Sequence, residues 1–207
     1  MRQCGIEATL CLPGGDLVRL CVSLLTTLVG AGLSLSAAPI VYTATLNGAN
    51  EVPANASPGL GSAIVTVDDV ANTMRVQVVF SGLIGTTTAA HIHCCTAVPG
   101  VGTAGVATVT PTFTGFPSGV TSGSYDNTFD MTLAGSYNPS FVSAHTDVPG
   151  AFTFLVNGIA AGDAYLNIHS TFAPGGEIRG FLEPVPEPAT FALVGVALLG
   201  VAVRRRK

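Results

Sequence analysis

The chain has 207 residues and a formal net charge of −4 at pH 7, a length that leaves room for one ordinary domain once processing segments at its ends are set aside. The segment from Pro39 to Glu187 contains ten acidic residues and two arginines, a net charge of −8. Such a surface repels phosphate backbones, which excludes nucleic acid as a partner.

Residues 1–38 are predicted to be a signal peptide. Arg2 and Arg19 flank a region that becomes apolar from Leu17 to Leu35 and ends in a run of mostly small residues, which a signal peptidase needs. A buried core helix is the alternative, and the small-residue exit together with the β-like sequence that follows disfavours it. We therefore expect an N-terminal signal helix that signal peptidase removes between Ser36 and Ala38, with export of the body.

The body, residues 39–183, reads as a series of β-strands. Two runs, 62–68 and 73–80, are separated by Asp69-Val70-Ala71-Asn72 and form a predicted hairpin. In the second run, alternate apolar residues share one face: Met74, Val76, Val78 and Phe80. A first strand is expected before the turn dipeptide Asn47-Gly48, at 40–46, and further strands at 89–94, 124–133, 164–169 and 177–182.

Two short helices interrupt the strands. Asn138-Pro139 reads as an N-cap followed by proline at the first helical position, and 149–161 is a second candidate that ends at Gly162. We predict a mainly β fold, an antiparallel Greek-key-like β-sandwich with one or two short helices. The sequence contains no Walker A motif, Rossmann fingerprint or G-x-S-x-G elbow, and no catalytic residue is assigned.

Residues 184–207 contain three features in series. Pro186-Glu187-Pro188 is followed by an apolar run from Ala189 to Val203 and by a basic cluster of Arg204, Arg205, Arg206 and Lys207. The run of about 15 residues would rise about 22 Å as a helix, a little short of a bilayer core of about 30 Å. We expect a C-terminal transmembrane helix that holds the protein in the inner membrane before processing, with the basic cluster on the cytoplasmic side.

This end of the chain resembles the PEP-CTERM sorting signal of exopolysaccharide-producing Gram-negative bacteria. The resemblance implies that an exosortase-type membrane protease cuts near the Pro-Glu-Pro. It also implies that the body passes to the surface of the cell envelope or to the extracellular space.

Two segments of the body carry paired polar residues on single strands. His91 and His93 lie two apart, as do Asn167 and His169, so each pair shares one strand face. These segments, the Gly-Glu-Ile-Arg-Gly run at 176–180 and the early 46–53 segment resemble the CHRD domain, first recognised in chordin, over roughly residues 42–182. The resemblance implies a fold and brings no catalytic activity with it.

His91, His93 and His169 are candidate ligands for a copper or zinc ion, because two imidazoles on one strand and a third on another are able to close a site. The alternative is a structural network in which these rings bond carbonyls and carboxylates. Glu177 and Arg179 alternate on one strand and are expected to pair with each other or to reach the histidines.

Cys94 and Cys95 are the only cysteines of the body. A vicinal disulfide, two free thiols and ligation of a soft metal together with His93 are all compatible with the sequence, and oxidation is favoured outside the cytoplasm.

Three functions from different classes follow from these observations. The first is a non-enzymatic surface or matrix protein that binds a polysaccharide or another protein. The second is an extracytoplasmic metal-binding or redox protein that uses the histidines. A hydrolase is third, because no nucleophile–base pair is recognisable. We expect a binding or structural role at the cell exterior, and no enzymatic activity.

Overall fold

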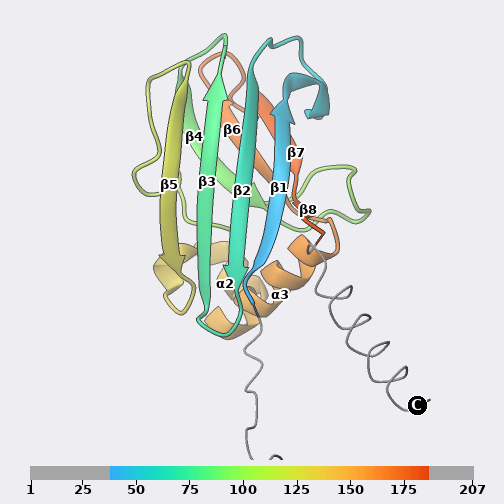
Figure 1. Ribbon diagram of the computed structural model, residues 1–207, viewed down its shortest axis with the longest axis vertical. Coiled ribbons are helices and arrows are strands. Elements are labelled where there is room, and N and C mark those ends of the chain that lie inside the picture. The colour runs from blue at the N-terminus through green and yellow to red at the C-terminus, as the bar shows by residue number, and fades with distance from the viewer. Residues whose placement is uncertain (1–37, 187–207) are drawn as a thin grey trace, which may run out of the picture. The chain divides into compact units, whose positions relative to one another are not determined.

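The computed structural model describes residues 38–186, and within them the chain is mainly β (Figure 1). The predicted signal helix, the predicted transmembrane helix at 189–203 and the basic cluster at 204–207 lie outside the described residues. The strands are β1 (Ile40–Asn47), β2 (Leu60–Asp68), β3 (Thr73–Ser81), β4 (Thr87–His93), β5 (Gly123–Asp130), β6 (Tyr165–Ser170), β7 (Ile178–Phe181) and β8 (Glu183–Pro184). The helices are α2 (Pro139–Ala144) and α3 (Val148–Ala160), with short 3-10 turns η1 (Gly48–Asn50) and η2 (Ala134–Ser136).

The strands form one antiparallel sheet in the order β4-β6-β7-β1-β2-β3-β5, with β8 beside β1. Figure 1 shows β4, β6 and β7 behind the layer made by β1, β2, β3 and β5, so the sheet curls over on itself. The sequence predicted an antiparallel sandwich, which would consist of two separate sheets. The strands are antiparallel, but they belong to a single curled sheet. The layers stay joined because β1 pairs with β2 along its whole length and meets β7 where Asn47 lies opposite Arg179.

The core fills the inside of the curl. In β3 the predicted apolar face is buried, and β2 contributes Ala63, Val65 and Val67 from the same side. The rear strands contribute Ile92, Leu166 and Ile168, which are fully enclosed. Because side chains alternate along a strand, this burial fixes the register: a slip by one residue would expose every one of these apolar groups.

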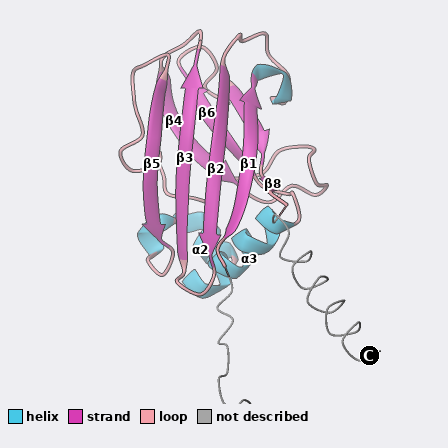
Figure 2. Ribbon diagram, in the orientation of Figure 1, coloured by secondary structure: helices cyan, strands magenta, loops and turns pink. Residues whose placement is uncertain are grey.

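Both predicted helices are present at one end of the sheet (Figure 2). Asn138 caps α2 by accepting a hydrogen bond from the Ser140 amide, and Pro139 occupies the first turn. Asp147 caps α3 in the same way, through the Gly150 amide, and α3 buries Leu155 and Ile159 against the core. Among residues 38–186, no helix has the length and apolar character needed to cross a membrane.

Candidate metal centre

The three candidate histidines lie on the outer face of β4 and β6, which are neighbours in the sheet. In the register of this pair, His91 lies opposite Asn167, and Ala89 lies opposite His169. The apolar residues between them point into the core, which turns the histidines to the other face. This face is also enclosed: His91 and His93 are buried and His169 is half-buried.

The side chains of the three histidines converge. One ring nitrogen from each lies within 4.8 Å of the others, and the ring centroids of the pairs are 5.3–5.9 Å apart. Three points so separated lie within about 2.8 Å of a common centre, and zinc–nitrogen bonds are about 2.0–2.1 Å long. Small side-chain movements are therefore enough to close the three rings around one ion.

The outward nitrogen of each ring is held by a backbone carbonyl from a loop. His91 Nε2 lies 2.7 Å from the Pro111 oxygen, and His93 Nδ1 lies 2.9 Å from the Ala104 oxygen. His169 Nδ1 lies 2.9 Å from the oxygen of Pro174. A carbonyl oxygen only accepts hydrogen bonds, so each outward nitrogen carries the proton and donates it.

The inward nitrogens are then bare acceptors. His91 Nδ1, His93 Nε2 and His169 Nε2 are buried and have no hydrogen-bond partner. A purely structural network would satisfy both nitrogens of each ring, and this arrangement satisfies only one. Ligation of a metal through one nitrogen, with the other ring N–H bonded to a carbonyl, is the usual arrangement of histidine ligands in proteins.

Burial keeps the three rings in the neutral form that binds metals. It lowers the pKa of His93 to about 4, and the neighbouring histidines add to this effect. Burial likewise lowers the pKa values of His91 and His169. At neutral pH, an ion therefore displaces no proton from these rings.

A stack of side chains continues from His93 across the outer face. The Tyr165 ring lies parallel to the His93 ring, with centroids 4.9 Å apart and an angle of 8° between the planes. Arg179, which lies on β7, places its guanidinium 4.6 Å from the centre of the Tyr165 ring. The Tyr165 hydroxyl bonds the backbone of Ala104, the residue whose carbonyl holds His93. Two contacts thus fix the orientation of His93.

The expected pairing of Glu177 with Arg179 is not found among the described residues. Arg179 instead lies 3.8 Å from the carboxylate of Glu51, in the segment after η1. Glu177 precedes β7 and accepts hydrogen bonds from the hydroxyls of Ser57 and Ser170 and from two backbone amides. Neither residue reaches the histidines through a hydrogen bond. No local pattern indicates Glu51 as the partner, because the two positions lie 128 residues apart in the chain.

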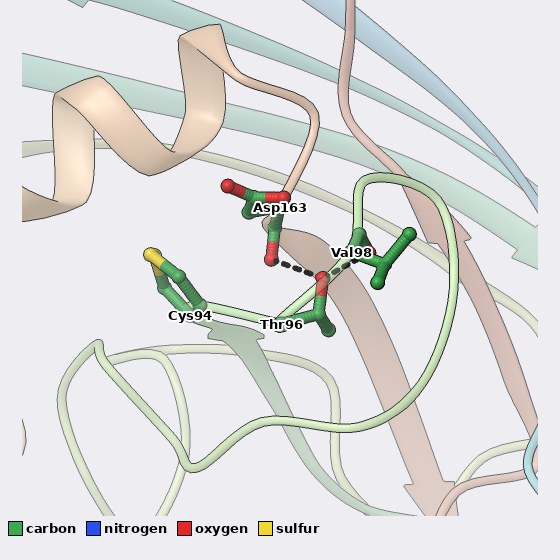
Figure 3. Close-up of a disulfide and its surroundings, with 5 residues drawn as sticks. Cys94, Thr96, Val98 and Asp163 are labelled. Atoms are coloured by element: carbon green, nitrogen blue, oxygen red, sulfur yellow. Dashed lines mark hydrogen bonds between the residues drawn. A yellow bond between two sulfur atoms is a disulfide. The ribbon is translucent and has the colours of Figure 1, made fainter.

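Cys94 and Cys95 form a disulfide at the end of β4, directly after His93 (Figure 3). The chain beyond it is held by Thr96, whose single hydroxyl proton is shared between the carbonyl oxygens of Val98 at 2.9 Å and Asp163 at 3.3 Å (Figure 3). The disulfide therefore does not supply a thiolate to the histidine cluster. The fourth histidine, His145, ends α2 and stacks on Phe154, so it takes no part in the cluster.

Of the sorting motif, only Pro186 lies in the described part, where it is exposed outside any strand or helix. Sequence reasoning also missed the loop residues that hold the rings, Ala104, Pro111 and Pro174. Only Pro174 stood in a recognisable turn signal, Pro174-Gly175-Gly176.

Comparison with known families gave two matches. The model of the CHRD domain matches residues 42–182, and the model of the PEP-CTERM protein-sorting motif matches residues 184–207. Comparison with curated proteins and with solved structures gave no significant match.

Proposed function

This chain belongs to the CHRD domain family, and from that premise we propose that it is a non-enzymatic protein of the cell-envelope surface whose domain holds a transition-metal ion through His91, His93 and His169. The PEP-CTERM motif supports export and sorting to the envelope surface by an exosortase-type system. The observation that carries the metal proposal is the convergence of three rings, each of which has one nitrogen held by a carbonyl and one buried nitrogen without a hydrogen-bond partner.

The donor set favours copper or zinc. Three imidazoles and no carboxylate make up the cluster, and calcium and magnesium prefer oxygen ligands. Imidazole suits copper and zinc, and among divalent ions copper binds such a site most tightly. A tetrahedral zinc ion bound here would take one further ligand beside the three imidazoles.

A binding role suits the enclosure of this cluster better than catalysis does. The inward nitrogens are shielded from solvent, and none of the three histidines lines the cleft of about 540 Å³ beside β1 and β7. A catalytic metal keeps a position that a substrate reaches, whereas a structural metal is closed in.

Metal titration of the full chain tests this proposal. The protein is stripped with a chelator, and binding of Zn²⁺ and Cu²⁺ is measured by calorimetry and elemental analysis. We expect one ion per chain and a loss of at least about tenfold in affinity for His169→Gln, because one of three ligands is removed. His145→Gln is the matched control, since His145 lies outside the cluster.

A second readout is unfolding. An ion that binds only the folded chain stabilises it by about 2.7 kcal/mol at a free concentration one hundred times Kd. Absence of binding by the unsubstituted protein, or an equal effect of His145→Gln and His169→Gln, would show the proposal to be wrong.

A further inference from the structure

A cleft of about 540 Å³ opens on the other side of the Tyr165–Arg179 stack, away from the histidines. Its floor is made by β1 and by Arg179 and Phe181 of β7, and its two walls are the segment 49–52 and the loop 100–102. Ligand sites commonly have volumes of about 300–1,000 Å³, so the cleft is large enough for two or three linked small rings.

Arg179 is the buried cation on the floor of this cleft. It is 2% exposed, and its Nε donates a hydrogen bond to the Asn50 carbonyl. The two terminal nitrogens of its guanidinium donate to no atom of residues 38–186, although they carry four N–H groups. Stacking against the rings of Tyr165 and Phe181 holds the guanidinium plane in place. The cleft therefore presents pre-oriented donors that lack acceptors.

The charges around the cleft argue against an anionic ligand. Glu51 lies 3.8 Å from Arg179, and Glu183 also lines the cleft, so an anionic ligand would be placed beside two carboxyl groups. Burial raises the pKa of Glu51 to about 7, so this carboxyl is in part protonated at neutral pH and is able to donate to a ligand oxygen as well as accept from a ligand hydroxyl. The ligand oxygens that satisfy Arg179 are thus expected to be uncharged. Asn50 in the 49–52 wall and two exposed threonines of the β1 floor, Thr43 and Thr45, add further polar groups to the cleft.

These features together fit a sugar better than a peptide. Extended peptides usually join the free edge of a sheet, and β1 is paired on both sides, by β2 and by β7 and β8. Sugar hydroxyls both donate and accept, as a guanidinium beside a carboxyl group requires. The half-buried ring of Phe181 offers an apolar surface to the C–H face of a sugar.

We propose that this cleft binds an uncharged saccharide unit, with Arg179 donating to its hydroxyl oxygens and Phe181 contacting its ring. None of the three histidines lines the cleft, so a test of saccharide binding is independent of the metal proposal.

Side-chain NMR of the full chain, in a detergent without a sugar head group, tests this site. The Nε–Hε signals of Arg179 and Arg75 are assigned from their loss in Arg179→Lys and Arg75→Lys. Cellotriose, maltotriose and mannotriose are the neutral probes, and tri-galacturonate is the charged one. We expect at least one neutral probe to shift the Arg179 signal saturably. The Arg75 signal should stay unchanged, because Arg75 lies on the exposed face of β3 and pairs with Asp126.

Variants separate binding from folding. Arg179→Lys keeps the charge but replaces the planar guanidinium with a single ammonium group, so affinity should fall by at least about tenfold. Because this variant lacks the Arg179 signal, its affinity and that of the unsubstituted protein are compared by calorimetry. Thr45→Phe fills the cleft from an exposed position and should abolish the shift, whereas Thr128→Phe, at an exposed position of β5, should not. No response to any neutral probe, a tighter response to tri-galacturonate than to all of them, or a shift that survives Thr45→Phe would overturn the proposal.

Discussion

Gly158 of α3 lies directly against the disulfide, and its replacement by alanine gives a sharp test of the packing at this end of the fold. A Cβ atom added at Gly158 would lie closer than 3.0 Å to the sulfur atoms of both Cys94 and Cys95, a distance that real Cβ atoms essentially never show. Alanine in a helix interior is favoured over glycine by about 1 kcal/mol, and overpacking a core costs about 1–3 kcal/mol. Because both sulfurs and the helix would have to shift, the upper end of that range applies. We expect Gly158→Ala to lower the free energy of unfolding by about 2 kcal/mol.

Removal of the sulfur atoms should reverse the sign of this effect. In a Cys94→Ala, Cys95→Ala background, the nearest remaining contact of the new Cβ is the Cβ of residue 95 at 3.4 Å, an ordinary separation. Gly158→Ala should then stabilise the protein by about 1 kcal/mol through helix propensity alone. The coupling energy between the sites is therefore expected to be about 3 kcal/mol.

Urea unfolding of the four proteins in this cycle measures the coupling, provided that the m-values agree. Asn157→Ala, at an exposed position of the same helix, is the control and should have the same effect in both backgrounds. If Gly158→Ala changes stability equally with and without the sulfurs, the close packing of α3 on the disulfide is refuted.

Two further predictions concern charge and sorting. Burial raises the pKa of the Glu51 carboxyl from 4.5 to about 7, so the folded state holds its proton more tightly than the unfolded state and stability is lost as the pH rises from about 4.5 to 7. Glu51→Gln removes this titrating group and therefore this loss. The difference in free energy of unfolding between Glu51→Gln and the unsubstituted protein, measured by urea titration, should therefore rise by about 3 kcal/mol in favour of the variant between pH 4.5 and pH 8. A difference that stays constant over this range would contradict the reasoning. Deletion of residues 186–188 or of 204–207 should change where the protein is found on cell fractionation, because each removes one part of the sorting signal; an unchanged location in both cases would count against processing there.

The alternation of side chains made most of the sheet predictable from the sequence. The hairpin of β2 and β3, the N-cap at Asn138 and the orientation of Ile92 and Leu166 toward the core are all confirmed. These features depend on local spacing and on the burial of apolar groups, which the sequence displays directly. His91, His93 and His169 were candidate metal ligands on the strength of the shared strand faces, beside the alternative of a structural network, and the structure places one ring nitrogen of each within 4.8 Å of the others.

Other features could not be predicted, because they depend on contacts between distant segments. The sheet is continuous because β1 pairs with β7. This pairing cannot be predicted from hydropathy, because strands with one apolar face show the same alternating pattern in one curled sheet as in two separate sheets. The partner of Arg179 was wrongly predicted for a related reason: the segment that carries Glu51 folds back over β7. The carbonyls of Ala104 and Pro111 hold the histidine rings only because a long loop runs beside β4, the edge strand of the sheet, and bonds to its backbone.

The burial of this outer face is itself an argument about the metal. The outer face of β3 is polar and largely exposed to solvent. The outer face of β4 and β6 is also polar, but it is largely buried. Covering polar side chains stabilises a fold only when each of their groups finds a partner. The loops supply a carbonyl to one nitrogen of every ring and leave the other nitrogen of each converging ring without a partner. A cation is the one partner that satisfies three converging acceptors at once, so under the proposed function the ion also holds the covering loops in place. Its removal should therefore increase amide exchange first in the loops around Ala104 and Pro174, and only later in the strands beneath them.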